Sequence, residues 1–182
     1  MPEKLAPDIC VIGAGAAGLS AAAAAALFGV PTVLIEQGKM GGECLNEGCV
    51  PSKALLAAAK RAANMNRGHE FGVPAGDVRV DFAKVQAHVQ DVIARITPVD
   101  SAERFAALGV RVIKGHATFT DRRTVLVGDA YEVRARRFIV ATGARAAGPP
   151  IPGLADGPYL TNETFFKLSE VPSHLVVIGA GP

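Results

Sequence analysis

Two cysteines in a glycine-rich stretch are the residues of this sequence best suited to chemistry. Cys44 and Cys49 are separated by four residues in the run GGECLNEGCVPSK, residues 41–53. An ideal helix would place them about 7.5 Å apart along its axis, whereas disulfide-bonded Cα atoms are rarely more than about 7 Å apart. Gly48 and Pro51 allow Cys44 to lie in a loop and Cys49 in the first turn of the following helix. With only three cysteines in 182 residues, a pair is expected to be reactive rather than structural.

The surroundings of Cys49 favour a thiolate. The N-terminus of a helix stabilises negative charge, so we expect Cys49 to carry the more stable thiolate. Lys53, one helical turn further on, adds positive charge. Two other interpretations remain open, namely two buried free thiols and half of a zinc site. Zinc needs further ligands at short spacing, but Cys10 falls in an apolar run and is interpreted as a small buried hydrophobe. The histidines are scattered at positions 69, 88, 116 and 174, so no metal site is expected.

A second motif lies upstream. Gly13, Gly15 and Gly18 form the pattern G-x-G-x-x-G directly after an apolar run and before an alanine-rich one. In this context the first glycine allows a tight turn, the second lets a pyrophosphate approach the backbone and the third lets helix and strand pack closely. Glu36 lies eighteen residues beyond Gly18, where an acid can accept hydrogen bonds from a ribose. The pattern predicts a dinucleotide site, although an ordinary turn into a helix would also show these glycines.

The elements that must position these motifs follow from hydrophobic periodicity. Residues 9–12 and 32–35 are short apolar runs typical of strands buried on both faces, and residues 19–28 form an alanine-rich helix that ends at Gly29. Together they predict a strand–helix–strand unit with a parallel sheet. Further helices are expected over residues 51–64, 82–96 and 98–108, with a loop over residues 68–80.

The pattern changes after Gly109. Residues 111–114, 124–127 and 131–135 alternate and are separated by turn residues, which predicts a three-stranded antiparallel meander. Residues 138–141 form another buried strand. The predicted fold class is therefore α/β, a Rossmann-like domain with a mostly parallel sheet flanked by helices plus this meander.

The domain organisation is predicted from the last forty residues. The first domain covers residues 1–150, and the Pro- and Gly-containing residues 151–174 form a linker. Residues 175–182 form a strand followed by Gly-Ala-Gly, the opening of a second dinucleotide unit that needs about 30 residues. We therefore expect the chain to be the N-terminal piece of a longer enzyme.

Composition excludes several classes of protein. Hydrophobic residues make up 49% and charged residues 20% of the chain, which is typical of a globular domain. The 19 basic and 17 acidic residues form no basic block, which argues against nucleic acid as a partner. No charge lies between Asp8 and Glu36, but that stretch is rich in glycine and alanine, so neither a membrane span nor a signal peptide is expected and the protein is placed in the cytoplasm.

Over nearly its whole length the chain resembles the N-terminal FAD-binding part of the flavoprotein disulfide reductases, which include dihydrolipoyl dehydrogenase, mercuric reductase and glutathione reductase. The run from Cys44 to Lys53 resembles the redox-active disulfide motif of that family. The resemblance implies that Cys44 is the interchange thiol, that Cys49 is the flavin-side thiol and that Lys53 lies beside the flavin ring. These three are the expected catalytic residues.

The resemblance also implies FAD contacts along the chain. Gly41 and Gly42 match the loop over the pyrophosphate, residues 115–117 match the segment that meets adenine, and residues 141–143 match the stretch that links the flavin and nicotinamide domains. The expected cofactor-binding residues are Gly13, Gly15, Ala17, Gly18, Glu36, Gln37, Gly41, Gly42, Cys44, Cys49, Lys53, Gly115, His116, Ala117, Ala141, Thr142 and Gly143.

The sequence departs from the family pattern in two places. Glu43 stands where the family often has threonine, and Glu47 places a negative charge near Cys44 that is expected to raise its pKa. The nicotinamide domain and the dimer-interface domain with its His–Glu pair would lie beyond residue 182. As a piece, the chain is expected to be inactive.

For the full-length protein, the resemblance implies a homodimeric oxidoreductase. Electrons would pass between NAD(P)H, FAD and the cysteine pair, and the substrate would be a dithiol, a disulfide or a mercuric ion. Residues 82–115 look closer to mercuric-reductase-like members. Two other hypotheses remain: a flavin-binding module without redox cysteines, and a flavin oxidase or monooxygenase domain in which the cysteines are incidental.

Overall fold

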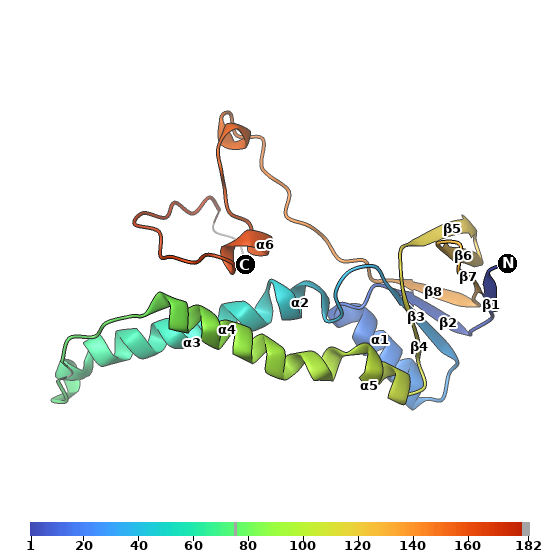
Figure 1. Ribbon diagram of the computed structural model, residues 1–182, viewed down its shortest axis with the longest axis horizontal. Helices are drawn as coiled ribbons and strands as arrows, with labels where there is room; N and C mark the ends of the chain where they lie inside the picture. The colour runs from blue at the N-terminus through green and yellow to red at the C-terminus, as the bar shows by residue number, and fades with distance from the viewer. Residues whose placement is uncertain (75, 180–182) are drawn as a thin grey trace.

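Two four-stranded sheets lie at one end of the molecule (Figure 1). The computed structural model describes residues 1–74 and 76–179. The first sheet is parallel throughout and has the order β4 (Arg111–Lys114), β3 (Thr32–Glu36), β2 (Ile9–Ile12), β8 (Arg137–Val140). The second has the order β1 (Glu3–Leu5), β7 (Tyr131–Arg134), β6 (Thr124–Val127), β5 (Ala117–Asp121). In it β5, β6 and β7 are antiparallel, and β1 runs parallel to β7.

The antiparallel meander exists, but the prediction of its strands was partly wrong. Residues 111–114 belong to the parallel sheet, where they pair with β3. Ile113 is buried between the sheets while Val112 packs on the opposite side, so this segment has an apolar residue for each face, as a parallel strand requires. The third strand of the meander is β5, which has no strand-like apolar pattern because most of its residues are exposed and polar.

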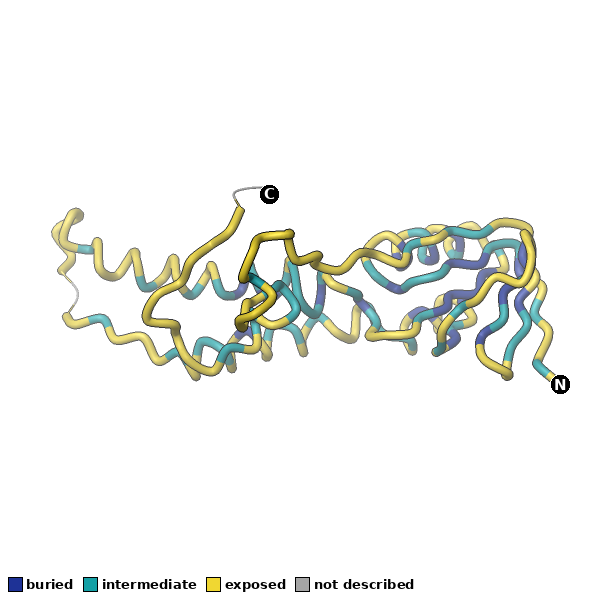
Figure 2. The backbone as a smooth tube through the Cα atoms, turned by 90° about the horizontal axis from the view of Figure 1, so that it is seen from above, coloured by how far each residue is buried: buried dark blue, intermediate teal, exposed yellow. Residues whose placement is uncertain are grey.

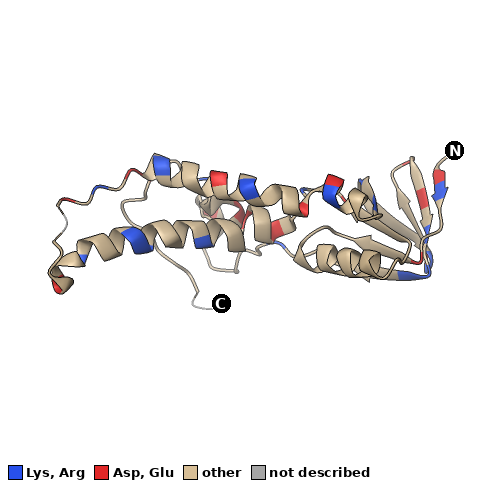
Figure 3. Cartoon of the chain, turned by 90° about the horizontal axis from the view of Figure 1, so that it is seen from below, with Lys and Arg blue, Asp and Glu red and all other residues tan. Residues whose placement is uncertain are grey.

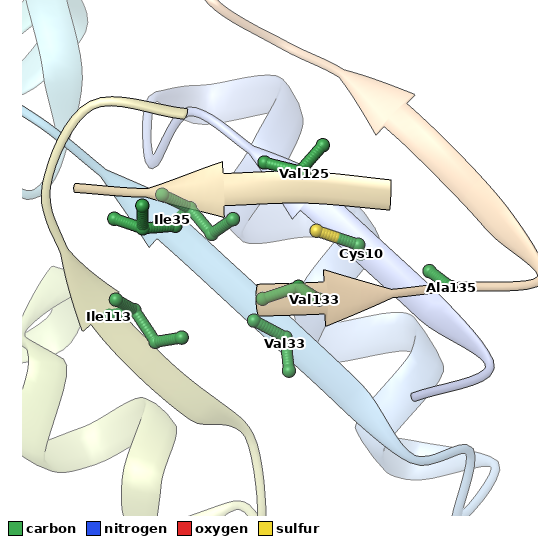
Figure 4. Close-up of a cluster of buried hydrophobic side chains, with 8 residues drawn as sticks. Cys10, Val33, Ile35, Ile113, Val125, Val133 and Ala135 are labelled. Carbon is green, nitrogen blue, oxygen red and sulfur yellow. The ribbon is translucent and has the colours of Figure 1, made fainter. Parts of the chain in front are cut away.

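The core consists of two apolar layers, one on each face of the parallel sheet. On one face α1 (Ala16–Leu27) packs Leu19 and Ala22 against Val11 and Leu34 of the strands. Phe105 of α5 (Ala102–Ala107) completes that layer. On the other face the two sheets pack on each other through small and β-branched residues (Figure 4). These residues are Cys10, Val33, Ile35, Ile113, Val125, Val127, Val133 and Ala135. This arrangement confirms the predicted α/β class with a Rossmann-like sheet.

A helical hairpin projects from the sheets. The short α2 (Gly42–Asn46) leads into α3 (Cys49–Asn66), a 3₁₀ turn over Gly68–Phe71, and α4 (Phe82–Ile96), which packs along α3. Most of the hairpin is exposed, in contrast with the buried strands (Figure 2). Helix α4 carries residues of both charges (Figure 3). Among them, Arg95 and Asp91 form an ion pair with their charged groups 2.6 Å apart.

Two predicted helices differ from those observed. The helix expected from residue 51 begins at Cys49, because Pro51 then occupies its first turn, where proline is tolerated. The helix expected over 98–108 is a 3₁₀ turn, Thr97–Asp100, followed by α5. The break lies at Ser101, whose extended backbone caps α5 and whose hydroxyl accepts a hydrogen bond from the Arg104 N–H.

The segment after β8 contains little regular structure. It has a 3₁₀ turn, Leu154–Asp156, and α6 (Asn162–Phe165), which is capped by Thr161. The strand predicted over residues 175–178 is absent, and all four side chains are exposed. A strand needs a neighbour for its backbone hydrogen bonds, and the described residues provide none there. The rest of the predicted Gly-Ala-Gly turn, residues 180–182, lies outside the described residues. Within the described residues, no helix combines the length and apolarity needed to cross a bilayer.

Candidate functional site: a cleft beside a dithiol

The glycine turn connects β2 to α1 through very close backbone contacts. Gly13 N–H donates to the carbonyl oxygen of Ile35 at 2.8 Å, and Gly15 caps α1. A Cβ on Gly18 would lie 1.8 Å from the carbonyl oxygen of Gly13, so no larger residue fits there without backbone movement. The turn leaves the first N–H groups of α1 pointing out of the helix end, where they can bind an anion.

Glu36, at the end of β3, holds the surrounding loops together. Its two carboxylate oxygens accept hydrogen bonds from the N–H groups of Ala14 and Gly38. Its backbone oxygen accepts from Gly115 N–H at 2.9 Å. A carboxylate has about four lone-pair sites, so capacity remains for the hydroxyls of a ligand. Glu36 therefore has a structural role beside the expected ribose contact.

The glycine turn borders a cleft of about 780 Å³. The lining residues are Gly13, Gly15, Glu36, Gln37, Gly38, Lys39, Gly42, Glu43, Asn46, Glu47, Ala141, Thr142, Gly143, Ala144, Arg145, Asn162 and Glu163. The cleft thus brings together eight of the residues predicted to bind the cofactor, from four separate segments of the chain. The predicted residues outside its lining are Ala17, Gly18, Gly41, Cys44, Cys49, Lys53, Gly115, His116 and Ala117.

Two predicted residues meet at the rim of the cleft. His116 Nδ1 and Gln37 Oε1 are hydrogen-bonded at 2.8 Å, across 79 residues of sequence. Gln37 lines the cleft, and His116 is exposed beside it. Ala117 begins β5 and packs against the core between the sheets. The segment expected to contact adenine is therefore next to the segment expected to contact ribose.

The cysteine motif lies directly against the glycine turn. Gly41 N–H donates to the carbonyl oxygen of Ala14 at 2.9 Å. Gly42 has a φ of 56°, and a Cβ on it would lie 2.6 Å from the Cα of Gly15. Asn46 stabilises the chain around the start of α2, since its Nδ2 donates to the carbonyl oxygens of Met40 at 3.1 Å and Gly42 at 2.8 Å. The two motifs of the sequence thus form one site.

The two cysteines lie at a helix junction. Cys49 is the first residue of α3, as predicted, but Cys44 lies in α2 rather than in a loop. The short helix ends at Asn46 with Glu47 as its C-cap, and Gly48 then packs close to Cys44, since a Cβ there would lie 3.5 Å from the Cα of Cys44. Both thiols are free; Cys44 is half-buried and Cys49 is exposed.

The pKa of Cys44 is raised above its ordinary value. The main cause is the hydrogen bond with the Cys49 side chain, followed by burial and the charge of Cys49, while the charge of Lys53 acts in the opposite direction. The expected cause was Glu47, which is not among these groups and instead pairs with Lys167 at 3.3 Å. The prediction of the direction is confirmed and that of the cause is wrong.

Several residues of the cleft are not among those predicted from the sequence. Lys39 and Arg145 line it and bring positive charge, and Asn162 and Glu163 of α6 form part of one wall. Lys39 and Arg145 directly flank stretches that the motifs identified, so proximity in sequence could have found them. Asn162 and Glu163 lie about 120 residues from the cysteines, and no local pattern marks them.

The residues of the cleft fit a dinucleotide. Its volume lies within the range of about 300–1,000 Å³ typical of cofactor sites. The glycine backbones allow close approach, the N-terminus of α1 and the cations of Lys39 and Arg145 suit a pyrophosphate, and Glu36 suits a ribose. Among the described residues, no three His, Cys, Asp or Glu side chains gather as a metal site would require.

Comparisons with known proteins identify relatives of the whole chain. Residues 7–182 match the family described as pyridine nucleotide-disulphide oxidoreductase. A mercuric reductase from Streptomyces lividans is 35% identical over 179 residues, which cover 96% of this chain and 38% of that protein. A dihydrolipoyl dehydrogenase from Geobacillus stearothermophilus is 38% identical over 179 residues, which cover 96% of this chain and 37% of that protein.

A similar solved structure is the HOCl-induced flavoprotein disulfide reductase RclA from Escherichia coli, with a TM-score of 0.74 and 27% identity. The match covers 92% of this chain and 35% of that one. This chain therefore spans between 35% and 38% of the length of these three proteins.

Proposed function

The chain belongs to the pyridine nucleotide-disulphide oxidoreductases, and from this premise we propose that it is the FAD-binding, dithiol-bearing part of an NAD(P)H-dependent disulfide oxidoreductase. The observation that carries the proposal is the contact of the two motifs. The first residue of α2, the helix that bears Cys44, packs against the glycine turn through the contact of Gly42 with Gly15. A dinucleotide held at the glycine turn would therefore lie next to the helix junction that carries both thiols.

Each part of the cleft has a proposed role toward the cofactor. The N-terminus of α1 and the backbone of the glycine turn bind the pyrophosphate, with Lys39 and Arg145 offsetting its charge. Glu36 binds the ribose, and residues 115–117 border the adenine. Residues 141–143 line the cleft beside Gly13, and we propose that Lys53 lies toward the flavin ring. Bound FAD supplies two-electron transfer between a nicotinamide cofactor and the Cys44–Cys49 pair.

The dithiol performs the exchange with substrate. The Cys44 thiolate attacks one sulfur of a disulfide, forms a mixed disulfide and releases the other sulfur as a thiolate. The Cys49 thiolate then attacks the sulfur of Cys44, closes the Cys44–Cys49 disulfide and releases the second substrate thiolate. Two electrons have then moved to the substrate, and two electrons that originate from NAD(P)H restore the dithiol. With a dithiol substrate the same steps run in reverse.

The finer identity of the enzyme is also proposed. The relatives include mercuric reductases and dihydrolipoyl dehydrogenases, so the candidate substrates are a mercuric ion, dihydrolipoamide and a related disulfide. We expect residues 175–182 to begin the NAD(P)-binding domain and the full-length protein to be a homodimer. The reactive use of cysteine fits a reducing compartment, so we place the protein in the cytoplasm.

The test is spectroscopic and uses the full-length protein. Partial reduction is expected to produce a long-wavelength absorption band from a thiolate lying against the flavin. Cys49→Ser is expected to abolish this band and leave the flavin spectrum, whereas Cys44→Ser keeps it. Cys10→Ala is the matched control, because Cys10 is buried in the core between the sheets and must leave the band unchanged.

Two results contradict the proposal. A band that survives Cys49→Ser removes Cys49 from the flavin-side role. A wild-type protein with flavin but no band on reduction favours a flavin-binding module or an oxidase in which the cysteines take no part. Turnover with dihydrolipoamide, mercuric ion and glutathione disulfide then separates the substrates.

A further inference from the structure

The helix that bears Cys44 is tied to a distant segment of the chain. Asn162 Nδ2 donates to Glu43 Oε1 at 2.8 Å, across 119 residues of sequence. Lys167 Nζ donates to Glu47 Oε1 at 3.3 Å, across 120 residues. Glu43 lies in the first turn of α2 and Glu47 is the C-cap of that helix, so Cys44 lies between them in the sequence. These four residues, Glu43, Glu47, Asn162 and Lys167, are called the clasp below.

The clasped segment forms a wall of the cleft. Asn162 and Glu163 line the cleft, as do Glu43, Asn46 and Glu47 of the cysteine motif. The same segment borders a second, apolar cavity of about 220 Å³. Phe165 and Leu168 line this cavity together with Leu55 and Phe82 of the hairpin. The segment therefore reaches the cleft on one side and the hairpin on the other.

The segment depends on these contacts for its position. Its only α-helix, α6, has four residues, far below the roughly 12–15 at which an isolated helix is even marginally stable. Between β8 and Thr161 the described chain has no helix or strand apart from one 3₁₀ turn. Nothing in the local backbone can therefore fix where residues 161–168 lie.

We propose that Glu43, Glu47, Asn162 and Lys167 are positioning residues that hold segment 161–168 over the cleft, so that the clasp controls how long the cofactor stays bound. The inference rests on the proposed function for the identity of the cofactor. It adds that the carboxylates on either side of Cys44 serve as anchors for the wall of the cleft.

The first test measures the segment without reference to the cofactor. In the full-length protein, hydrogen exchange of the backbone amides of residues 164–168 is expected to be about fivefold faster in Glu43→Ala, the effect of one ordinary hydrogen bond. Glu43→Gln keeps an acceptor oxygen for Asn162 and is expected to exchange as the wild type does. The double variant Glu43→Ala/Asn162→Ala is expected to exchange no faster than Glu43→Ala, because each of the two substitutions removes the same hydrogen bond.

The second test measures the release of FAD from the purified holoprotein. Lys167→Met is expected to release flavin about threefold faster, the size of effect that a partly exposed ion pair allows. Lys167→Arg keeps the charge and is expected to restore the wild-type rate. Lys4→Met is the matched control, because its ion pair with Glu132 at 3.9 Å lies in the second sheet. The urea midpoint is expected to be the same in all of these proteins.

Failure of the inference can be told from failure of the proposed function. If the wild type binds FAD and shows the thiolate–flavin band, but Glu43→Ala and Lys167→Met leave exchange and release unchanged, only the clasp is overturned. Faster release that appears only with a lowered urea midpoint, or that Lys167→Arg fails to correct, also overturns it. If the wild type binds no flavin, the proposed function fails, while the exchange measurement still decides whether the clasp holds the segment.

Discussion

The glycine turn (Gly13–Gly18) and α2 (Gly42–Asn46), the helix that bears Cys44 and is called the redox helix below after its proposed role, are neighbours in space but are held by different kinds of contact. At the glycine turn, backbone packs on backbone: the Cβ positions of Gly13 and Gly18 fall 2.2 Å and 1.8 Å from main-chain oxygen atoms. At the redox helix, side chains on the surface make the distant contacts, at 2.8 Å from Asn162 and 3.3 Å from Lys167. The turn can accommodate no added atom at Gly13 or Gly18, whereas the side-chain contacts of the second region can be changed one at a time.

This difference separates two requirements of the site. A pyrophosphate needs main-chain N–H groups within hydrogen-bond distance, and any Cβ in the way would remove them. A dithiol needs a suitable pKa for each thiol and a suitable position of the segment that covers it. Charges and side-chain hydrogen bonds can change both in small steps. The three predictions that follow test whether the two regions respond as differently as their contacts indicate.

The largest effect is expected from Gly18→Ala. The added Cβ would overlap the carbonyl oxygen of Gly13. Gly18 is buried and Gly13 is half-buried, so neither residue can move away without a shift of the backbone. Alanine is the better helix former by about 1 kcal/mol, but forced overpacking should outweigh this and lower the free energy of unfolding by about 3 kcal/mol net. Urea unfolding of the purified variant measures the loss.

Gly157→Ala is the control for this prediction, because a Cβ there meets no atom within 4 Å and its φ of −129° is open to any residue. It is expected to unfold at the wild-type urea midpoint or slightly above it. Equal midpoints for Gly18→Ala and the wild type would show that the turn is less tightly packed than its geometry indicates.

An intermediate effect is expected from Glu36→Ala. The substitution removes the acceptors of the Ala14 and Gly38 N–H groups, and Ala14 is fully buried, so its N–H would be left without a partner. The expected loss is about 2 kcal/mol in the free energy of unfolding. Glu36→Gln retains one acceptor oxygen and should lose about half as much. A loss that is the same for both variants would mean that the charge, and not the hydrogen bonds, holds the loops.

The same contrast explains which parts of the site the sequence predicted. The strands β2 and β3, the turn at Gly13–Gly18 and the start of α3 near Pro51 are local patterns of apolar periodicity, glycine and proline, and these were predicted within a few residues. Fold class followed from them. The assignment of residues 111–114 to the meander was wrong. Over only four residues, the alternation of apolar and polar side chains is the same in an edge strand of a parallel sheet as in an antiparallel meander.

The rest of the site depends on contacts between distant residues. Asn162 and Lys167 reach the redox helix only because the chain returns after β8, and nothing in their own neighbourhood indicates this. The cause of the raised Cys44 pKa was misassigned for the same reason. Glu47 is close in sequence, but its partner Lys167 could be identified only in three dimensions.

The smallest effect, and the one that most sharpens the comparison, is a shift in the pKa of Cys44. Because that pKa is raised, its thiolate forms at a higher pH than that of an ordinary cysteine, and alkylation of Cys44 in the reduced protein should rise at correspondingly high pH. Cys49→Ala removes the hydrogen bond and charge that are the main cause, so the profile should move to lower pH. Lys53→Met removes the one cation among the causes, so the profile should move to higher pH.

Iodoacetamide labelling across a pH series, with Cys44 followed by peptide mass spectrometry, measures both shifts. If the two substitutions shift the pH profile in opposite directions and leave the free energy of unfolding unchanged, single side chains set the pKa of Cys44. The glycine turn cannot be adjusted in this way. Displacements in the same direction would mean that the substitutions loosen α2 as a whole. In that case the redox helix would be as dependent on packing as the turn it rests on, and the distinction between the two regions would be wrong.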